Sequence, residues 1–488
     1  MELPRGTERQ RKITAPEARW MKRAELEQRQ YVAGSILLGR DNDGNFIGAI
    51  NDDGRPDDRH IVTVAGSRAG KSSTCLKPNL ALWPSSVLCI DPKGELATET
   101  AVKRAQMGQD VYILDPFNEV KGDARKYLAS YDPLDEIKAG KEEDIIDNSA
   151  MLADAMIVPD KDAKSDHWTT SAKNLVRGFI LWALHRDLNH DQTVSINDIR
   201  EALLAPQESE DDEEGDEIGM DTLFKMMGDT EAFSGVLAGI GNSMAGKPTN
   251  EKGSIISTAI EQTAFLDSEP MQTHFEGEDL RPLPSLRILK QRPTTIYLVL
   301  PASRMGTHFR WLRMILTLAL SALENEPHQL GKDGHVLFIL EEFPQLGYLR
   351  QIESAAGLMA GYNVKLWTVL QDLSQLKSQY RDSWETFIGN AGVFQAFGNT
   401  DATTTEYISR SLGNLQIAET TPTYATASNV GGGGLTEREN SKGVPLLAPF
   451  EIAQYCARET GMQIIRFAGK PPAYIHRMTH EEVSKIGN

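Results

Sequence analysis

The sequence predicts an α/β protein with a mainly parallel central sheet and an inserted all-α domain. Short apolar runs alternate with helical segments in residues 35–140 and again in residues 290–488, a pattern typical of a parallel sheet covered by helices. Between these stretches, helical periodicity dominates residues 141–289. We therefore expect one α/β domain built from two separate stretches, a helical domain inserted between them, and an N-terminal arm over residues 1–34.

The expected strands are short apolar runs bounded by turn-forming residues. A weak β signal near the start is split by the turn-rich segment Asp41–Gly44, and the later runs predict buried strands. By contrast, Thr420–Gly443 is rich in Thr, Ser and Gly and contains four consecutive glycines, Gly431–Gly434, so we expect a flexible loop there. In chain order, the expected strands are Ser35–Leu38, Phe46–Ile50, Ile61–Val64, Val87–Ile90, Val111–Leu114, Thr295–Leu300, His335–Leu340, Val364–Leu370 and Val393–Phe397.

Helices are expected where apolar residues recur at three- and four-residue spacing. In the α/β stretches these are Leu96–Met107 and Phe309–Ala322, and in the insertion most clearly Ile145–Met156 and Ser171–Leu188. The acidic run Glu208–Glu217 holds eight acids in ten residues and indicates either a solvated loop or a docking strip for a basic partner. Along the second insertion helix, a core-facing stripe is expected from Trp168, Leu175, Phe179 and Trp182.

Composition and charge narrow the class of protein. The chain has 488 residues and a net charge of -18, which fits a globular protein of several domains but not one that coats DNA with its whole surface. Its three cysteines, Cys75, Cys89 and Cys456, are not spaced for zinc and cannot all pair, so a reducing cytosol fits. The N-terminus resembles no signal peptide, and the most apolar helix, Met314–Leu323, is too short to cross a bilayer. We therefore expect a soluble protein.

A phosphate-binding loop follows the strand Ile61–Val64. The segment Ala65-Gly66-Ser67-Arg68-Ala69-Gly70-Lys71-Ser72 meets the pattern G-x-x-x-x-G-K-[ST] with one departure, an alanine at the first glycine position. Strand, loop and helix in this order direct backbone amides at an anion, the lysine adds a positive charge, and the serine hydroxyl can bind Mg²⁺. The loop therefore predicts a nucleoside triphosphate site. The expected nucleotide-binding residues are Gly66, Ser67, Arg68, Ala69, Gly70, Lys71, Ser72 and Ser73.

Polar side chains also follow two later strands. Glu341 and Glu342 come directly after His335–Leu340, where the first acid can hold Mg²⁺ and the second can orient or deprotonate an attacking water. Paired acids at a buried strand end are costly to desolvate unless a cation compensates, which favours this role over a structural one. Gln371 follows the strand Val364–Leu370, and its amide can hold the γ-phosphate or the water.

Two arginines have alternative roles. Arg59 precedes the phosphate-loop strand and either reaches the γ-phosphate of a neighbouring subunit as an arginine finger or caps the strand at the surface. Arg68 lies inside the loop and either touches the nucleotide or faces solvent. A kinase of small molecules would use similar residues. The helical insertion and the second acid suit a motor-type ATPase better.

Further motifs extend along most of the chain. They are Ala18-Arg19-Trp20 with Glu25-Leu26, Cys89-Ile90-Asp91-Pro92-Lys93-Gly94-Glu95-Leu96, Leu114-Asp115-Pro116-Phe117, Tyr131-Asp132-Pro133-Leu134, Ile339-Leu340-Glu341-Glu342-Phe343-Pro344-Gln345-Leu346-Gly347, Ala360-Gly361-Tyr362-Asn363-Val364, Gln371-Asp372-Leu373-Ser374-Gln375-Leu376, Gly389-Asn390-Ala391-Gly392 and Glu406-Tyr407-Ile408-Ser409. Together, and in consistent order over residues 17–475, they resemble the type IV secretion coupling proteins, the ATPases of bacterial conjugation. Several of these motifs are far more specific than a phosphate loop alone.

The resemblance implies a RecA-like P-loop ATPase domain with an all-α insertion, assembled as a homohexameric ring around a channel. It also implies ATP and Mg²⁺ as cofactors. The implied work is recruitment and transport of DNA, a relaxase–DNA complex or protein effectors into a type IV secretion channel, at the cytoplasmic face of the bacterial inner membrane. The matched positions are Lys71 and Ser72 for phosphate and Mg²⁺, Glu341 for the metal, Glu342 for catalysis, Gln371 for sensing, and Arg59 for a contact bordering the nucleotide.

Two departures from the family pattern matter. Glu341 stands where the family usually has Asp, so its side chain is one methylene longer. Family members also typically carry N-terminal membrane helices, which we expect to be absent here, so that any membrane contact runs through a missing anchor or a partner. Two alternatives therefore stay open. One is a substrate receptor with weak ATPase activity that recognises cargo through the helical domain, and the other is a related hexameric DNA translocase.

Overall fold

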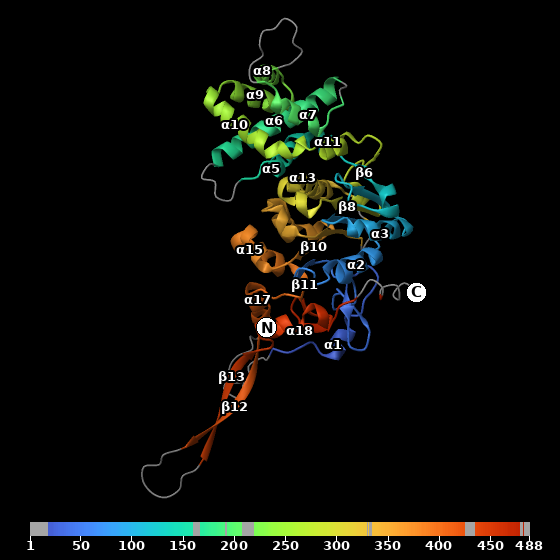
Figure 1. Ribbon diagram of the computed structural model, residues 1–488, viewed down its shortest axis with the longest axis vertical. Helices are drawn as coiled ribbons and strands as arrows, with labels where there is room; N and C mark the ends of the chain where they lie inside the picture. Colours follow the sequence, from blue (N-terminus) through green and yellow to red (C-terminus); the bar gives the residue numbers. More distant parts are fainter. Residues whose placement is uncertain are drawn as a thin grey trace, which may run out of the picture.

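The computed structural model is elongated, with three parts in line (Figure 1). A helical region lies at one end, a large sheet with its covering helices lies in the middle, and a two-stranded hairpin projects from the other end. The acidic run Glu208–Glu217 falls outside the described residues. The residues that the structure describes are 18–159, 166–190, 193–206, 219–328, 330, 334–424, 435–478 and 482.

One sheet of eleven strands organises the middle of the molecule. In spatial order, its strands are β2 (Phe46–Gly48), β1 (Leu37–Arg40), β15 (Ala473–His476), β14 (Met462–Phe467), β11 (Ala391–Phe397), β3 (His60–Ala65), β10 (Val364–Leu370), β9 (Val336–Leu340), β4 (Val87–Asp91), β8 (Thr294–Val299) and β5 (Asp110–Leu114). The seven strands from β11 to β5 are parallel, and β14, β15, β1 and β2 add an antiparallel edge. Every residue of β3, β4, β8, β9 and β10 is buried, which explains why these strands are apolar runs rather than alternating ones.

Helices connect and cover the parallel strands. An aspartate caps the first turn of two helices that follow strands: Asp372 accepts from the amide of Gln375 at 2.9 Å, and Asp401 accepts from the amide of Thr404 at 2.8 Å. The helices of this part are α1 (Arg23–Glu27), α2 (Lys77–Leu82), α3 (Glu95–Gln106), α4 (Pro133–Lys138), α12 (Ile288–Gln291), α13 (Ala302–Asn325), α14 (Arg350–Leu358), α15 (Leu373–Tyr380), α16 (Glu385–Gly389), α17 (Ala402–Leu412) and α18 (Pro449–Tyr455).

The helical region is built from segments that follow α4 and precede β7 (Arg281–Pro282), which pairs in parallel with β6 (Ala129–Ser130). Leu175 and Phe179 are buried in it, as the core stripe predicts. One helix of the region packs on α13, so a single apolar core runs from the sheet into it. The domain boundaries at residues 141 and 289 stay a prediction. Its helices are α5 (Ile145–Met156), α6 (Asp166–His190), α7 (Ile196–Leu204), α8 (Met220–Gly228), α9 (Val236–Ala245), α10 (Thr249–Thr263) and α11 (Glu269–Glu276).

The C-terminal part differs from the sequence-based expectation. In place of a loop over Thr420–Gly443, β12 (Asn414–Tyr424) and β13 (Leu435–Pro445) form an antiparallel hairpin, so the predicted loop is wrong for both flanks. Threonine is β-branched and favours extended backbone, which a composition-based prediction overlooks. The glycines Gly431–Gly434 lie outside the described residues. The strands β14 and β15 were not predicted at all.

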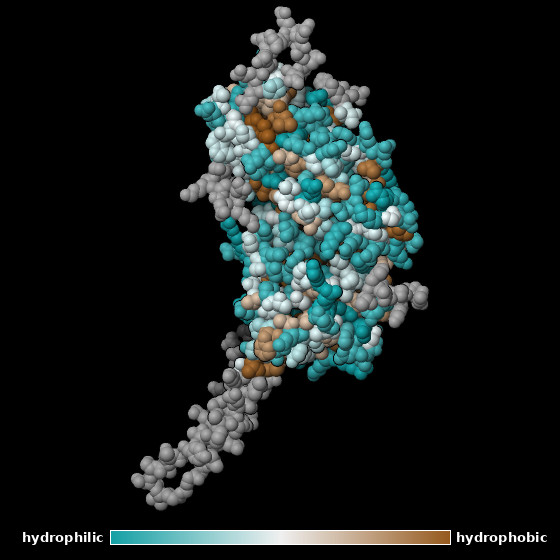
Figure 2. All heavy atoms as spheres, in the orientation of Figure 1, coloured by the Kyte–Doolittle hydropathy of each residue, from teal (hydrophilic) through white to brown (hydrophobic). Residues whose placement is uncertain are grey.

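The surface in this view is mostly hydrophilic (Figure 2). Small apolar patches lie over the helical region and near the base of the hairpin. Among the described helices, none is both long and apolar enough to cross a membrane. Short 3₁₀ segments join the main elements: η3 (Gly122–Tyr127), η4 (Glu142–Asp144), η5 (Phe233–Gly235), η6 (Ala264–Asp267), η7 (Phe343–Leu346), η8 (Met359–Tyr362), η9 (Arg381–Ser383) and η10 (Arg458–Thr460).

Candidate active site

The phosphate loop leads from the end of β3 into η2 (Ser72–Leu76), a π-helical turn that continues as α2. Two loop residues, Arg68 and Gly70, have positive φ angles of 56° and 97°. At the second position this conformation costs little, because glycine has no Cβ. The Nζ of Lys71 donates to the carbonyl oxygen of Ala65 at 3.2 Å. The lysine therefore folds back over the loop.

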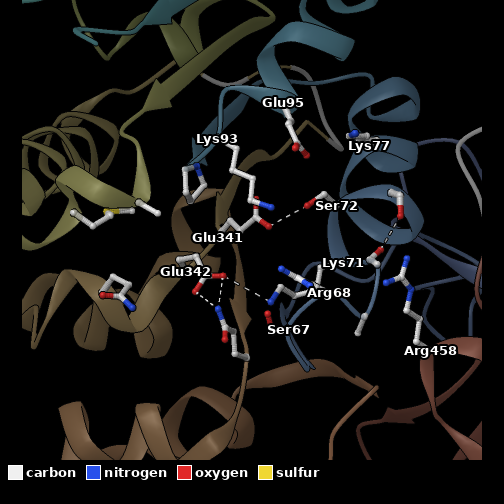
Figure 3. Close-up of a pocket in the computed structure, with 18 residues that line it drawn as sticks. Ser67, Arg68, Lys71, Ser72, Lys77, Lys93, Glu95, Glu341, Glu342 and Arg458 are labelled. Atoms are coloured by element: carbon white, nitrogen blue, oxygen red, sulfur yellow. Dashed lines mark hydrogen bonds and ion pairs between the residues drawn. The ribbon is translucent and has the colours of Figure 1, made fainter. Parts of the chain in front are cut away.

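A cavity of about 560 Å³ opens beside the loop, at the carboxyl ends of β3, β4, β9 and β10 (Figure 3). Its volume lies in the range of pockets that bind small molecules. Both basic and acidic side chains line it. This position agrees with the general rule that open parallel sheets bind ligands at the carboxyl ends of their strands.

Glu341 meets Ser72 inside this cavity. The serine Oγ donates to the Oε1 of Glu341 at 3.1 Å (Figure 3). Burial raises the pKa of Glu341 to about 7, and the charge of Asp91 adds to this effect. The hydrogen bond from Ser72 and the charge of Lys71 lower the pKa and oppose it. A hydroxyl and a carboxyl at this distance supply the oxygen ligands that Mg²⁺ prefers.

Glu342 is held by two neighbouring side chains. The Nε2 of Gln371 donates to both of its carboxylate oxygens at 2.9 Å, and the Nζ of Lys71 lies 3.7 Å from its Oε1. The backbone of Glu342 has a φ of 54°, which is uncommon for a residue other than glycine. This left-handed residue ends the strand and starts η7, and its side chain lines the cavity.

Asp91 ends β4 and interacts electrostatically with Glu341. Its Oδ2 accepts from the amide of Ala97 at 2.8 Å, and its Oδ1 accepts from the amide of Lys93 at 3.3 Å, so the carboxyl also fastens the start of α3. Burial raises the pKa of Asp91 to about 6, while these backbone bonds oppose the shift. Two buried carboxyls thus act on each other. A cation beside them would stabilise their ionised forms.

Most of the predicted site residues come together here. Residues 67–73, Glu341, Glu342 and Gln371 all line the cavity, so Arg68 lies at the cavity as well. Gly66 does not line it. A Cβ built on Gly66 would lie 2.0 Å from the carbonyl oxygen of Gly398, so close packing against the turn after β11 requires glycine at this position.

Arg59 lies at the opposite end of β3 from the loop. Its Nε and Nη2 donate to the two carboxylate oxygens of Asp57 at 3.0 and 2.7 Å, and its side chain is 43% exposed. The fold therefore does not bring Arg59 to the phosphate loop of its own subunit. A contact with the nucleotide of a neighbouring subunit stays a prediction.

Eight lining residues were not predicted as site residues, and five of them are polar or charged. Lys93 and Glu95 follow β4, so their position after a strand could have predicted them as site residues. Lys77 lies further along the helix after the loop, and Gln345 lies in the motif after β9. Arg458 comes from the turn after α18, where no motif marks it.

Comparison with known families now identifies the chain. The family described as "Type IV secretory system Conjugative DNA transfer" matches residues 10–481. The chain belongs to this family. The match confirms the resemblance that the sequence motifs indicate, and it extends across the α/β part and the helical region alike.

Two relatives illustrate the extent of the similarity. The conjugal transfer protein TraG of Escherichia coli is 27% identical over 465 residues, which cover 91% of this chain and 70% of TraG. VirD4 of Rhizobium radiobacter is 24% identical over 426 residues, which cover 86% of this chain and 57% of VirD4. The family member described here therefore spans only part of the length of these relatives.

Solved structures support the fold. The bacterial conjugative coupling protein TrwBdeltaN70 superposes with a TM-score of 0.64 at 15% identity, covering 95% of this chain and 94% of that one. TrwB in complex with the non-hydrolysable ATP analogue ADPNP gives the same TM-score and identity, with 95% of each chain covered. The likeness at this level of identity is one of fold. It confirms the predicted RecA-like α/β fold with a mainly parallel sheet.

Proposed function

We propose that this protein is the ATPase of a conjugative DNA transfer system, a coupling protein that drives cargo into a type IV secretion channel. One observation carries the proposal. The acid pair after β9 meets Lys71 and Ser72 of the phosphate loop in one cavity. A phosphate loop alone indicates only nucleotide binding, whereas a loop with an acid pair beside it has the parts that hydrolysis needs.

The residues present fit ATP with Mg²⁺. Ser72 and Glu341, in hydrogen-bond contact, would hold the Mg²⁺, and Lys71 would hold the β- and γ-phosphates. When bound, the Mg²⁺ neutralises the charge that develops on the phosphates. A phosphate in the loop would compete with Ala65 and Glu342 for the Nζ of Lys71. Nucleotide binding would thus release Glu342 from one of its two partners.

Glu342 is the proposed general base. Its carboxylate takes the proton of the water that attacks the γ-phosphorus, and ADP leaves on the opposite side. Gln371 donates to both oxygens of that carboxylate and so fixes its direction. Because Gln371 follows β10, which pairs with both β3 and β9, a shift at the γ-phosphate would reach two strands of the sheet.

The family suggests the cargo and the setting. We propose that the chain acts on DNA, a relaxase–DNA complex or a protein effector, together with components of the secretion channel, at the cytoplasmic face of the bacterial inner membrane. Contact with the membrane would run through an anchor or a partner. The active form would be a homohexameric ring, in which Arg59 of one subunit lies at the γ-phosphate of the next.

ATP hydrolysis with and without single-stranded DNA, measured over a series of salt concentrations, tests this proposal. We expect DNA to stimulate turnover at low salt and less so at high salt, since phosphate contacts are screened. Lys71→Ala should abolish the activity. Lys103→Ala, an exposed lysine on α3 outside the cavity, is the matched control and should behave as wild type. If DNA does not change the turnover at any salt concentration, the proposal that DNA is the cargo would be contradicted.

A substrate receptor with weak ATPase activity is the second candidate. The raised pKa of Glu341, about 7, favours it, because a carboxyl that is partly protonated at neutral pH holds Mg²⁺ less well. Glu341→Asp, which restores the usual family residue, distinguishes the two candidates. If the wild type is a receptor, this variant should hydrolyse ATP much faster. Wild-type turnover near that of active family members would rule out the receptor.

A further inference from the structure

Arg458 lines the active-site cavity from a distant part of the chain. It opens η10, the turn between α18 and β14. Figure 3 shows it on the other side of the loop from Glu341 and Glu342, with its guanidinium directed toward the loop. The cavity therefore has two ends, the acid end with Glu341 and Glu342, and the Arg458 end.

A buried guanidinium holds the Arg458 end in place. Arg477 donates through Nη2 to the carbonyl oxygens of Arg458 at 2.6 Å and Ala457 at 3.4 Å, and through Nη1 to the carbonyl oxygen of Ala69 in the loop. It also lies 4.8 Å from the ring centre of Phe397. One side chain thus ties the turn that carries Arg458 to the phosphate loop.

The two ends of the cavity correspond to the two ends of a bound nucleotide. Ser72 and Glu341 hold the Mg²⁺ of the β- and γ-phosphates in the proposed function, so the γ-phosphate lies at the acid end. The loop spans the phosphates, and the nucleoside then extends toward the Arg458 end. A guanidinium is planar and weakly hydrated, which suits it to stack on an aromatic base.

We propose that Arg458 binds the nucleoside of ATP by stacking its guanidinium on the base, and that Arg477 positions it. This inference rests on the proposed function, because it requires a nucleotide in this cavity. A contact with the nucleoside is the same before and during hydrolysis. Arg458 therefore contributes to affinity and KM rather than to kcat. Arg477 itself bonds to main-chain carbonyl groups and acts as a positioning residue.

Calorimetric titration with two ligands tests the proposal. The first ligand is ADPNP with Mg²⁺, and the second is inorganic tripolyphosphate with Mg²⁺, which has the phosphates but no nucleoside. Arg458 is exposed, so Arg458→Ala should weaken ADPNP binding by roughly two- to fivefold, as expected for a guanidinium–aromatic contact at an exposed side chain, and leave tripolyphosphate binding unchanged. In hydrolysis assays the same variant should raise KM and keep kcat. Arg410→Ala, an exposed arginine on α17 outside the cavity, is the matched control.

Other outcomes would overturn the proposal. Equal weakening of both ligands by Arg458→Ala would make Arg458 a phosphate contact, and unchanged ADPNP binding would remove it from the site. Arg458→Lys keeps the charge but not the planar group, so full recovery by this variant would exclude stacking. Lys71→Ala should weaken both ligands. A wild-type protein that binds neither ligand would overturn the proposed function itself, and this inference with it.

Discussion

The acid end and the Arg458 end of the cavity are built on different scaffolds. At the acid end, Glu341 and Glu342 follow β9 and Gln371 follows β10, two neighbouring parallel strands. The side chains there bond to one another, since Gln371 donates to Glu342 and Ser72 donates to Glu341. The register of the sheet therefore sets the acid end, and its members depend on each other's charge.

The Arg458 end depends on the antiparallel edge of the sheet. There β14 and β15 bring the C-terminal segment beside the loop, and Arg477 bonds to main-chain carbonyls rather than to side chains. In the described part of the chain, the hydrogen bonds of Arg477 go to the carbonyl oxygens of Ala69, Ala457 and Arg458, and none of these three bonds joins it to an acidic side chain. This difference in construction predicts that the two ends contribute to different kinetic quantities. Changes at the acid end should alter the rate of hydrolysis, and changes at the Arg458 end should alter affinity.

The largest effect is expected for Glu342→Gln. Removing a general base costs roughly 10²–10⁴ in kcat, whereas an isosteric amide leaves the cavity intact, so ADPNP affinity should stay near the wild-type value. Steady-state hydrolysis and ADPNP titration on the same preparation measure both quantities. Glu385→Gln, an exposed acid at the start of α16, is the matched control and should change neither. A variant that keeps the wild-type kcat would contradict the assignment of rate to the acid end.

A smaller effect is expected for Gln371→Ala. This change removes the donor to both oxygens of Glu342. Because a hydrogen bond to a charged group is worth about 1.5–3 kcal/mol, kcat should fall roughly ten- to hundredfold while nucleotide affinity holds. Gln454→Ala, an exposed residue on α18, provides the control. A fall in affinity with an unchanged kcat would move Gln371 from orienting the base to binding the nucleotide.

The two ends also differ in how far the sequence could predict them. Glu341, Glu342 and Gln371 each follow an apolar strand directly, and the carboxyl ends of parallel strands meet at one edge, so their proximity could be predicted. The contact between Arg477 and Arg458 could not be predicted. Arg477 donates to the main-chain carbonyl of Arg458, and every residue has such a carbonyl, so no residue type marks the contact. The proximity of the two residues also depends on β14 and β15, which were not predicted.

The same contrast holds for larger elements. The parallel strands and the helices α5 and α6 follow from local periodicity, which a single segment carries. The hairpin of β12 and β13 depends on pairing between two segments, and no local pattern in a Thr-rich stretch reveals its partner. Gly66 illustrates the limit at a single position. The sequence analysis predicts Gly66 as a nucleotide-binding residue, whereas the contact that requires glycine there is with Gly398.

The pH dependence of Mg²⁺ binding tests the role of Glu341 at the acid end. The pKa of Glu341 is raised to about 7 from its ordinary value of 4.5, by burial first and then by the charge of Asp91. Because Mg²⁺ binds the ionised carboxylate, its affinity in the presence of ADPNP should rise about tenfold between pH 6 and pH 8. Glu341→Gln should lower the affinity and flatten the profile. A wild-type profile that is flat over this range would contradict an active role for Glu341.

The free energy of unfolding should change in the opposite direction, because it should fall as the pH rises. The fold favours the protonated form of Glu341, so its contribution to the free energy of unfolding is largest below pH 4.5 and is lost as the pH rises through about 7. Asp91, with a pKa raised to about 6, adds to the same trend over a lower range. Urea unfolding of wild type and Glu341→Gln at matched pH values isolates the contribution of Glu341. The difference between the two proteins should vary mainly between about pH 4.5 and pH 7.

The smallest effect is expected for Arg477→Lys. The variant keeps the positive charge, but an ammonium cannot bond to the carbonyls of Ala69 and Arg458 at once as the guanidinium does. Loss of one such bond, worth about 0.5–1.5 kcal/mol, should weaken ADPNP binding by roughly two- to tenfold. Tripolyphosphate binding should weaken too, since Ala69 belongs to the loop that both ligands occupy. Here Arg477→Lys differs from Arg458→Ala, which spares tripolyphosphate.

The double variant Arg458→Ala/Arg477→Lys then separates positioning from contact. If Arg477 acts partly through Arg458, the two losses in ADPNP affinity should combine to less than their product, because residues that share an effect are not additive. For tripolyphosphate, the double variant should match Arg477→Lys alone. Full additivity for ADPNP would mean that Arg477 supports only the loop. Arg458 would then reach the nucleoside without its help, and the Arg458 end would consist of two independent parts.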